Sequence, residues 1–212
     1  MKKYEMTSNI KEFLGHKLFQ IRALKDFGDV KAGDFGGYIE KEENLSQYGN
    51  AWIYGDALVY GNALVYGNAL VYGNAWIYGN ARVYGNARIY DDALVYGNAL
   101  VYGNAYIFNN AWIYDNAQVY GDTRIYGDTC ICGDAWVCGD SDYICFKGFG
   151  SENRNTTMFR IKNGDICVCC GCFGGSLKEF EEKVKETHGN TKYAKEYLVC
   201  IEAAKIHFEI DE

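Results

Sequence analysis

A six-residue repeat runs through this sequence from residue 49 to residue 138 without insertion or deletion. Each hexad reads Gly, then Asn or Asp, then Ala or Thr, any residue, Ile or Val, and finally Tyr, Phe or Cys, and fifteen hexads follow one another. Asp91, Asn109 and Asp115 replace the leading Gly. A short fixed period indicates a chain of stacked units, because no single unit can bury its own apolar face.

The spacing within each hexad predicts short strands separated by corners. The Ala or Thr and the Ile or Val are two residues apart, so in an extended segment they point to the same side. The Gly-Asn or Gly-Asp pair suits a corner, because these residues tolerate positive φ. Proline would remove a strand hydrogen-bond donor, and the sequence contains none. We therefore expect an all-β solenoid whose interior holds small and β-branched residues.

The hexad pattern resembles the hexapeptide-repeat left-handed β-helix family, and residues 44–57 also resemble uncharacterised transferase-like β-solenoids of bacteria. The resemblance covers about half of the chain. It implies a left-handed parallel β-helix of about five or six triangular coils, with three hexads in each coil. A looser resemblance links the tail to proteins of phages and prophages of Gram-positive bacteria. Its residues are Arg154, the run from Cys170 to Phe173 and the run from Glu186 to Gly189.

Three segments follow from the limits of the repeat. We expect an N-terminal cap over residues 1–42, the β-helix over residues 43–142, and a small α+β module over residues 143–212. Caps are needed because an open solenoid leaves unpaired strand edges at both ends.

The pattern of the tail predicts three strands and two helices. The strands are expected at residues 143–149, 156–162 and 165–170, and Asn163-Gly164 is a typical hairpin turn between the last two. Ser176 and Glu179 form a capping-box pattern that begins a helix, which Gly189 ends. A second helix is expected over residues 191–208.

With three hexads per coil, the fourth hexad position sorts into three outward faces, and one of them carries no charge. An apolar surface of this size is more than soluble monomers usually expose, although stacking of like residues accounts for the tyrosines. We therefore expect an interface there, and the resemblance implies a homotrimer. A host protein, or a small ligand in a cleft between subunits, is the alternative occupant. The predicted interface residues are Leu58, Trp76, Leu94, Trp112, Tyr60, Tyr78, Tyr96 and Tyr114, next to Cys130.

The family resemblance also implies an acyltransferase that uses acetyl-CoA or another acyl-CoA and a histidine base. The histidines are His16, His188 and His207, and none lies in the repeats or on a loop between them. Such chemistry needs a group that accepts the proton of the acceptor. We therefore expect no catalytic residue and no cofactor, and we keep acyl transfer as the alternative function.

Nine cysteines form two groups, residues 130–145 and residues 167–172, with Cys200 apart. The C-x-C-C-x-C run lacks the C-x₂₋₄-C spacing of structural zinc sites. On a strand Cys167 and Cys169 share a face and Cys170 lies opposite, so metal binding would need the two groups to meet in space. Buried free thiols are the simpler interpretation, and we expect no metal.

The formal net charge of −7 argues against binding to nucleic acid, and no apolar stretch is long enough to span a bilayer. Mimicry of DNA would need roughly 15 charges over the array, whereas residues 49–142 hold three Arg against nine Asp. The start of the chain lacks a signal-like apolar run, so we expect a cytoplasmic protein, in the host cytoplasm if a phage encodes it. The predicted function is a non-catalytic binding protein, phage-encoded and host-modulating, for example by blocking a defence protein or sequestering a small nucleotide.

Overall fold

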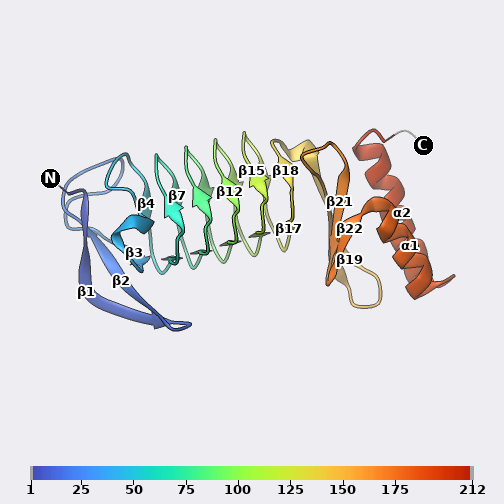
Figure 1. The fold of residues 1–212 in the computed structure, drawn as a ribbon, viewed down its shortest axis with the longest axis horizontal. Helices are drawn as coiled ribbons and strands as arrows, with labels where there is room; N and C mark the ends of the chain where they lie inside the picture. Colours follow the sequence, from blue (N-terminus) through green and yellow to red (C-terminus); the bar gives the residue numbers. More distant parts are fainter. Residues whose placement is uncertain (1, 211–212) are drawn as a thin grey trace.

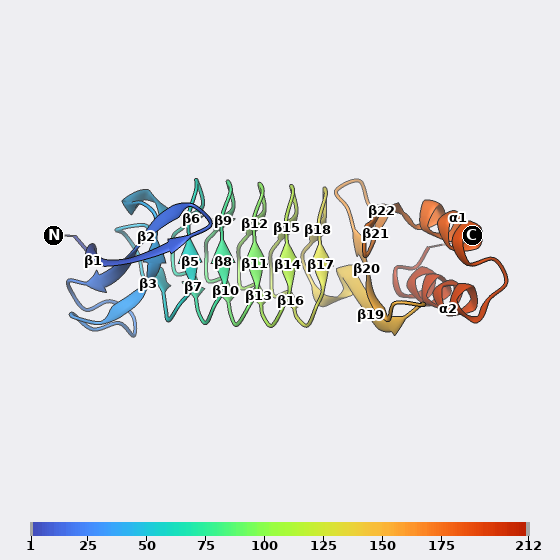
Figure 2. The same cartoon turned by 90° about the horizontal axis from the view of Figure 1, so that it is seen from below.

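The hexads stack as coils in the middle of an elongated molecule (Figure 1). The computed structural model describes residues 2–210. An N-terminal hairpin lies at one end of the array, and an antiparallel sheet with two helices lies at the other (Figures 1 and 2). The predicted β-solenoid with a small α+β module is confirmed. Within the described residues, no helix combines the length and apolar character needed to cross a bilayer.

Each hexad contributes one two-residue strand, and strands one coil apart pair in parallel. One sheet contains β4 (Trp52–Ile53), β7 (Leu70–Val71), β10 (Arg88–Ile89), β13 (Tyr106–Ile107) and β16 (Arg124–Ile125). A second contains β6 (Leu64–Val65), β9 (Arg82–Val83), β12 (Leu100–Val101), β15 (Gln118–Val119) and β18 (Trp136–Val137). The third contains β5 (Leu58–Val59), β8 (Trp76–Ile77), β11 (Leu94–Val95), β14 (Trp112–Ile113) and β17 (Cys130–Ile131). These sheets are the three predicted faces, and the left hand of the coil stays an expectation from the resemblance.

The core of the array is the column of small and β-branched side chains that the hexad spacing predicts. The Ala and the Ile or Val of each hexad are buried. Thr123 and Thr129 replace Ala in two hexads, and their hydroxyls donate hydrogen bonds of 2.7 Å and 2.6 Å to backbone carbonyls of the preceding corner. The two buried hydroxyls are therefore satisfied.

The corners explain why glycine leads most hexads. The backbone φ is 70° at Gly85, in the left-handed region that costs a residue with a Cβ about 1–2 kcal/mol. Asp91, Asn109 and Asp115 adopt similar values of 56°, 58° and 56°. Asn and Asp are the residues with side chains that enter this region most readily.

Asparagine side chains at the corners form hydrogen-bonded ladders from coil to coil. Asn68 donates to Asn86 at 3.1 Å, and Asn86 donates to Asn104 at 3.0 Å. Asn104 in turn donates to Asp122 at 2.9 Å. A carboxylate can only accept, so it can stand only where a ladder ends. Other donor–acceptor runs end in the same way, at Asp92, Asp128 and Asp134.

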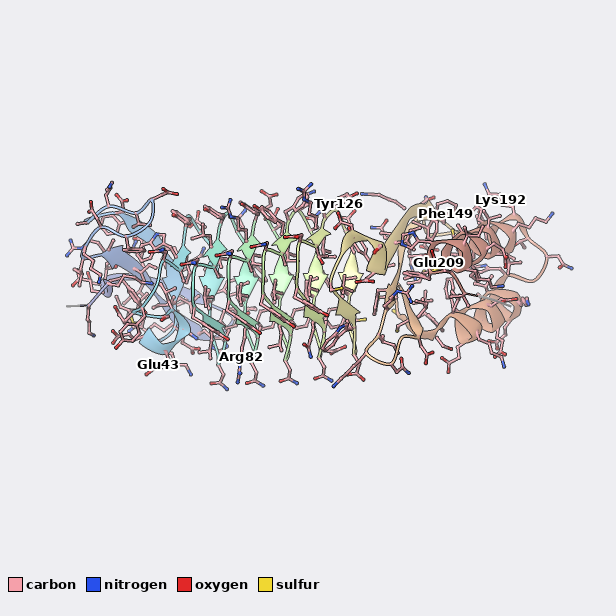
Figure 3. The ribbon with its side chains drawn as sticks, turned by 90° about the horizontal axis from the view of Figure 1, so that it is seen from above. Glu43, Arg82, Tyr126, Phe149, Lys192 and Glu209 are labelled. Atoms are coloured by element: carbon pink, nitrogen blue, oxygen red, sulfur yellow. The ribbon has the colours of Figure 1, made fainter. Side chains whose placement is uncertain are left out.

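Tyrosine rings at the last hexad position stack in similar ladders. Tyr60, Tyr78, Tyr96 and Tyr114 stack with centroids 4.8–5.1 Å apart and with planes within 5° of one another. The interpretation of these residues as same-face ladders is confirmed. Outward side chains accordingly stand in rows along the array, with Arg82 and Tyr126 at opposite edges of the view in Figure 3.

Residues 2–48 close the N-terminal end of the array. The elements there are β1 (Tyr4–Phe13), β2 (His16–Ala23), β3 (Phe35–Ile39) and the 3₁₀ turn η1 (Glu42–Asn44). Strand β3 pairs with β5. The Lys3 ammonium donates to the Ala51 carbonyl at 2.8 Å, and the Asn44 amide donates to the Ala63 carbonyl at 2.9 Å. Each of the three sheets therefore meets a hydrogen-bonding partner at this end. Burial of the Lys3 side chain lowers its pKa to about 8.

The C-terminal sheet closes the other end. It contains β19 (Tyr143–Phe149), β20 (Arg154–Arg160), β21 (Ile166–Cys170) and β22 (Phe173–Ser176), and the turn η2 (Asp140–Asp142) precedes it. The backbone amide of Arg124 donates to Asp140 at 2.7 Å, and that of Cys130 donates to the Thr157 hydroxyl at 3.3 Å. Ala135 forms an antiparallel bridge to Ile161. All three open edges are thus engaged.

Two helices cover the far face of this sheet. Helix α1 (Leu177–His188) begins at the predicted capping box, in which the Glu179 amide donates to the Ser176 hydroxyl at 3.2 Å. Helix α2 (Lys192–His207) follows. Phe180 and Ile201 pack with Val168 of β21 in a second core. Strand β22 is not predicted, because its Phe-Gly-Gly-Ser sequence has neither alternation nor β-branched residues.

The ladder polarity predicts different effects for two conservative changes. Asn86→Asp removes a donor in mid-ladder and sets a carboxylate against the Asn104 oxygen, so we expect the free energy of unfolding to fall by about 1 kcal/mol. Asp122→Asn at the ladder end keeps an acceptor and should change the free energy of unfolding by less than about 0.5 kcal/mol. Urea denaturation at neutral pH measures both. Equal losses would contradict the proposed polarity.

Candidate functional site

The uncharged face is partly covered by the protein's own N-terminal hairpin. Strands β1 and β2 lie across the face that contains β5 (Figure 2). Leu58 and Tyr60 are buried beneath Leu18, with exposures of 1% and 5%. These two predicted interface residues are therefore unavailable to a partner, because long-range packing of the hairpin has already covered them.

The hairpin tip places an aromatic ring and a histidine on this face. Phe13 packs edge-on against Trp76 at 4.6 Å between centroids. His16 lies against Tyr60 at 4.8 Å, and its Nδ1 is 2.8 Å from Oε1 of Glu40. The second oxygen of Glu40 accepts from the amide of Gly61 at 2.7 Å. Both oxygens of the carboxylate are thus fixed.

Glu40 holds the His16 ring in the way that a carboxylate orients a histidine base. Hydrogen bonding to His16 lowers the pKa of Glu40, so the carboxylate stays ionised. A carboxylate on Nδ1 leaves Nε2 as the ring nitrogen that can exchange a proton, and the His16 side chain is 37% exposed. Sequence reasoning missed this pair, because the two residues lie on different strands and no motif links them.

The remainder of the face is open to solvent. Leu94, Tyr96 and Tyr114 are partly exposed, and Trp112 is 46% exposed. We call these four residues the exposed strip. It lies between the hairpin and the C-terminal module, and the structure brings together here four of the eight predicted interface residues. Trp76 and Tyr78 stand between the covered and the open part.

Three cysteines meet where the strip reaches the C-terminal module. The sulfur atoms of Cys130, Cys132 and Cys169 lie within 4.8 Å of one another. The Tyr114 hydroxyl is 3.3 Å from the sulfur of Cys130 and 4.0 Å from that of Cys169. Hydrogen bonds from the other two thiols lower the pKa of Cys132, and hydrogen bonding to Cys132 raises the pKa of Cys130. The two cysteine groups of the sequence therefore do meet in space.

A pocket of about 250 Å³ lies in the C-terminal module. Its walls contain residues from all three tail segments that the sequence analysis singled out, namely Arg154, Cys172, Phe173, Thr187 and His188. Arg154 forms no hydrogen bond or ion pair with residues 2–210, and a Cβ at Gly171 would come within 2.6 Å of its guanidinium. Glycine at that position therefore leaves room for the arginine.

The array is similar to known solenoid repeats. Residues 51–66, 63–78, 75–88 and 87–103 match the family described as the YdcK β-solenoid repeat. The protein named "Uncharacterized acetyltransferase YdcK" of Escherichia coli (strain K12) is 56% identical to this chain over 36 residues. That alignment covers 17% of this chain and 11% of the relative's length. The resemblance of the array to hexapeptide-repeat β-helices is confirmed, and the resemblance of the tail to phage proteins stays a prediction.

The family match falls where the chain carries corners and stacking rows. It covers residues 51–103, which contain interior Ala and Val, corner Gly and Asn, and ladder Tyr. His16, Glu40, the three clustered cysteines and the pocket of the module lie outside these residues. The match to the family therefore supports the fold. It does not bear on the side chains that could react or bind a ligand.

Proposed function

We propose that the protein is a non-catalytic binding protein whose copies associate through the exposed strip, with a trimer as the first expectation. The observation that carries this proposal is the strip itself, because Trp112 leaves nearly half of its large apolar surface in water. Contiguous apolar surface exposed on soluble proteins usually marks an interaction surface. The hairpin and the module border the strip at its two ends, so an occupant must fit between them.

A charge placed on the strip should break the assembly. We expect Trp112→Glu to raise the dissociation constant of the oligomer about 30-fold, which is the ~2 kcal/mol loss typical of a buried tryptophan at an interface. Gln118→Glu adds the same charge at the same hexad position on the neighbouring face, and it should leave the dissociation constant unchanged. Sedimentation velocity in reducing buffer measures the mass. A monomeric wild-type protein, or equal effects of both variants, would contradict the proposal.

The pocket of the module suits a small anionic ligand. The guanidinium of Arg154 has no partner within the described chain, and His188 stands in the same walls. The walls also contain Glu152 and Lys183, whose ammonium pairs with Glu186 at 2.8 Å. Phe173, Phe180 and Tyr197 add aromatic surface against which a base could stack. In the phage setting that the tail resembles, holding a nucleotide in this pocket would withdraw a signal from a host defence system.

Removal of the arginine should weaken anion binding. We expect the wild-type protein to bind adenosine monophosphate more tightly than inorganic phosphate, and Arg154→Ala to weaken binding of both at least ~10-fold, since a charged hydrogen bond contributes about 1.5–3 kcal/mol. Arg82→Ala, an exposed arginine on the array, is the matched control. Isothermal titration calorimetry gives the constants. No heat with either ligand at millimolar concentration would exclude this part of the proposal.

Acyl transfer is the second candidate, and the His16–Glu40 pair favours it. Nε2 of His16 would take the proton of an acceptor amine or hydroxyl as that group attacks the thioester carbonyl, and the coenzyme A thiolate would leave. Glu40 would hold the ring in place. The similar protein of Escherichia coli carries the name "Uncharacterized acetyltransferase YdcK".

The two candidates differ in one measurement. If the protein transfers acetyl groups, mass spectrometry will detect free coenzyme A when acetyl-CoA and a set of amines are supplied. His16→Asn should then lower the rate by about 10²–10⁴-fold, with a smaller loss for Glu40→Gln and none for His207→Asn. No release of coenzyme A, together with no thermal shift at saturating acetyl-CoA, would exclude acyl transfer.

A further inference from the structure

We propose that Cys130, Cys132 and Cys169 bind one Zn²⁺ ion, which joins the C-terminal module to the last coils of the array. Two of the ligands come from the array and one comes from the module. The site is separate from the pocket of the module, and it does not depend on the function proposed above.

Two independent features of the fold bring the three thiols together. Cys132 occupies the hexad position at which Tyr60, Tyr78, Tyr96 and Tyr114 form their ladder, and Cys130 pairs in register with Trp112. The bulky outward side chains of the earlier coils are therefore replaced by thiols just where the module packs. Strand alternation then turns the Cys169 side chain of β21 towards the array, because Val168 and Cys170 belong to the core under the helices.

The distances fit tetrahedral coordination. With zinc–sulfur bonds of about 2.3 Å, two thiolates of a tetrahedral site are about 3.8 Å apart. The three sulfur atoms lie within 4.8 Å of one another, so shifts of well under about 1 Å for each side chain would bring them to the ion. Their separation exceeds the ~2.05 Å of a disulfide bond, and all three are free thiols.

The Tyr114 hydroxyl lies beside the three thiols. It lies 3.3 Å from the sulfur of Cys130 and 4.0 Å from that of Cys169, close to the oxygen–sulfur edge of about 3.5 Å expected for such a site. Either this hydroxyl or a water molecule can complete four-coordination. Cys167 shares the array-facing side of β21 with Cys169 but is not among the three clustered thiols.

The surroundings of the thiols favour a soft cation. Cys132 and Cys169 are buried, with exposures of 9% and 6%. A pocket of about 270 Å³, lined by Trp112, Cys130, Thr157 and Cys169 among others, leads from solvent to the cluster. An ion therefore has an entry path. Sulfur-only donors select Zn²⁺ and Cu(I) over Mg²⁺ and Ca²⁺, and the nearby fourth donor favours the four-coordinate geometry of Zn²⁺.

A bound ion would strengthen a junction that already contains hydrogen bonds, the ion pair between Lys147 and Asp128, and apolar packing of Phe159 against the core of the array. The module meets this edge of the array through the Thr157 hydroxyl and the bridge between Ala135 and Ile161. Zinc would add bonds from β17 of the array and β21 of the module to one ion. Because an ion that binds only the folded state stabilises that state, its removal should loosen the module first.

The test is the zinc content of the full chain. Protein purified with zinc in the medium and a non-chelating reductant should contain one Zn²⁺ per chain by elemental analysis and by native mass spectrometry. Co²⁺ in its place should give the thiolate charge-transfer absorption and the intense visible bands of a tetrahedral site. Cys132→Ser and Cys169→Ser should each lower the affinity at least ~10-fold. Cys172→Ser, an exposed thiol outside the cluster, should keep the full content.

A second measurement keeps the proposal testable if the serine variants unfold. Addition of a strong chelator to the wild-type protein should lower its melting temperature, and Zn²⁺ should restore it. The proposal is wrong if wild-type protein binds no Zn²⁺ in a titration against a competing chelator. It is equally wrong if Cys172→Ser loses the ion as well, if only Cu(I) is bound, or if mass spectrometry after alkylation finds two of the three cysteines joined in a disulfide.

Discussion

Parallel pairing between residues one coil apart is the constraint on which the rest of this structure depends. Each two-residue strand is too short to be stable alone, and it gains stability only from identical neighbours above and below. The Asn ladders and the Tyr stacks follow the same spacing as the strand pairs, so they stabilise the same contacts between coils. They need only the same residue type at the same hexad position in each coil. The cost is that the first and last coils have no neighbour, and non-repeating residues must supply the missing partners.

The two ends solve this problem with different chemistry. At the N-terminal end, strand β3 supplies a full partner for β5, and single side chains of Lys3 and Asn44 serve the other sheets. The buried ammonium of Lys3 shows how strong this demand is, because burial disfavours its charge. At the C-terminal end, a whole antiparallel sheet covers the edges, and thiols replace the aromatic rows beneath it. The ends are therefore where this chain departs from its own repeat.

The sequence predicted what periodicity controls and missed what depends on contacts between distant segments. Strand positions and the buried column follow from hexad spacing, the three faces follow from the family resemblance, and the Ser176 capping box indicated the start of α1. No local pattern could indicate that a hairpin would cover Leu58, or that Glu40 would meet His16. The meeting of Cys130 with Cys169 depends equally on how the module docks. Spacing rules drawn from sites within one segment therefore did not apply to thiols that two segments supply.

The residues that match other solenoids are not the residues that could react or bind a ligand. The match to YdcK repeats rests on residues that corners and ladders require of any such array, so it carries little information about a reaction. The hairpin histidine and the arginine pocket lie in segments added at the ends, and the thiol cluster lies where the last coils meet the module. The array fixes the distance between them. The added segments are free of the stacking that constrains the repeats, so a solenoid of this kind can gain new side-chain groups at its ends while its coils stay the same.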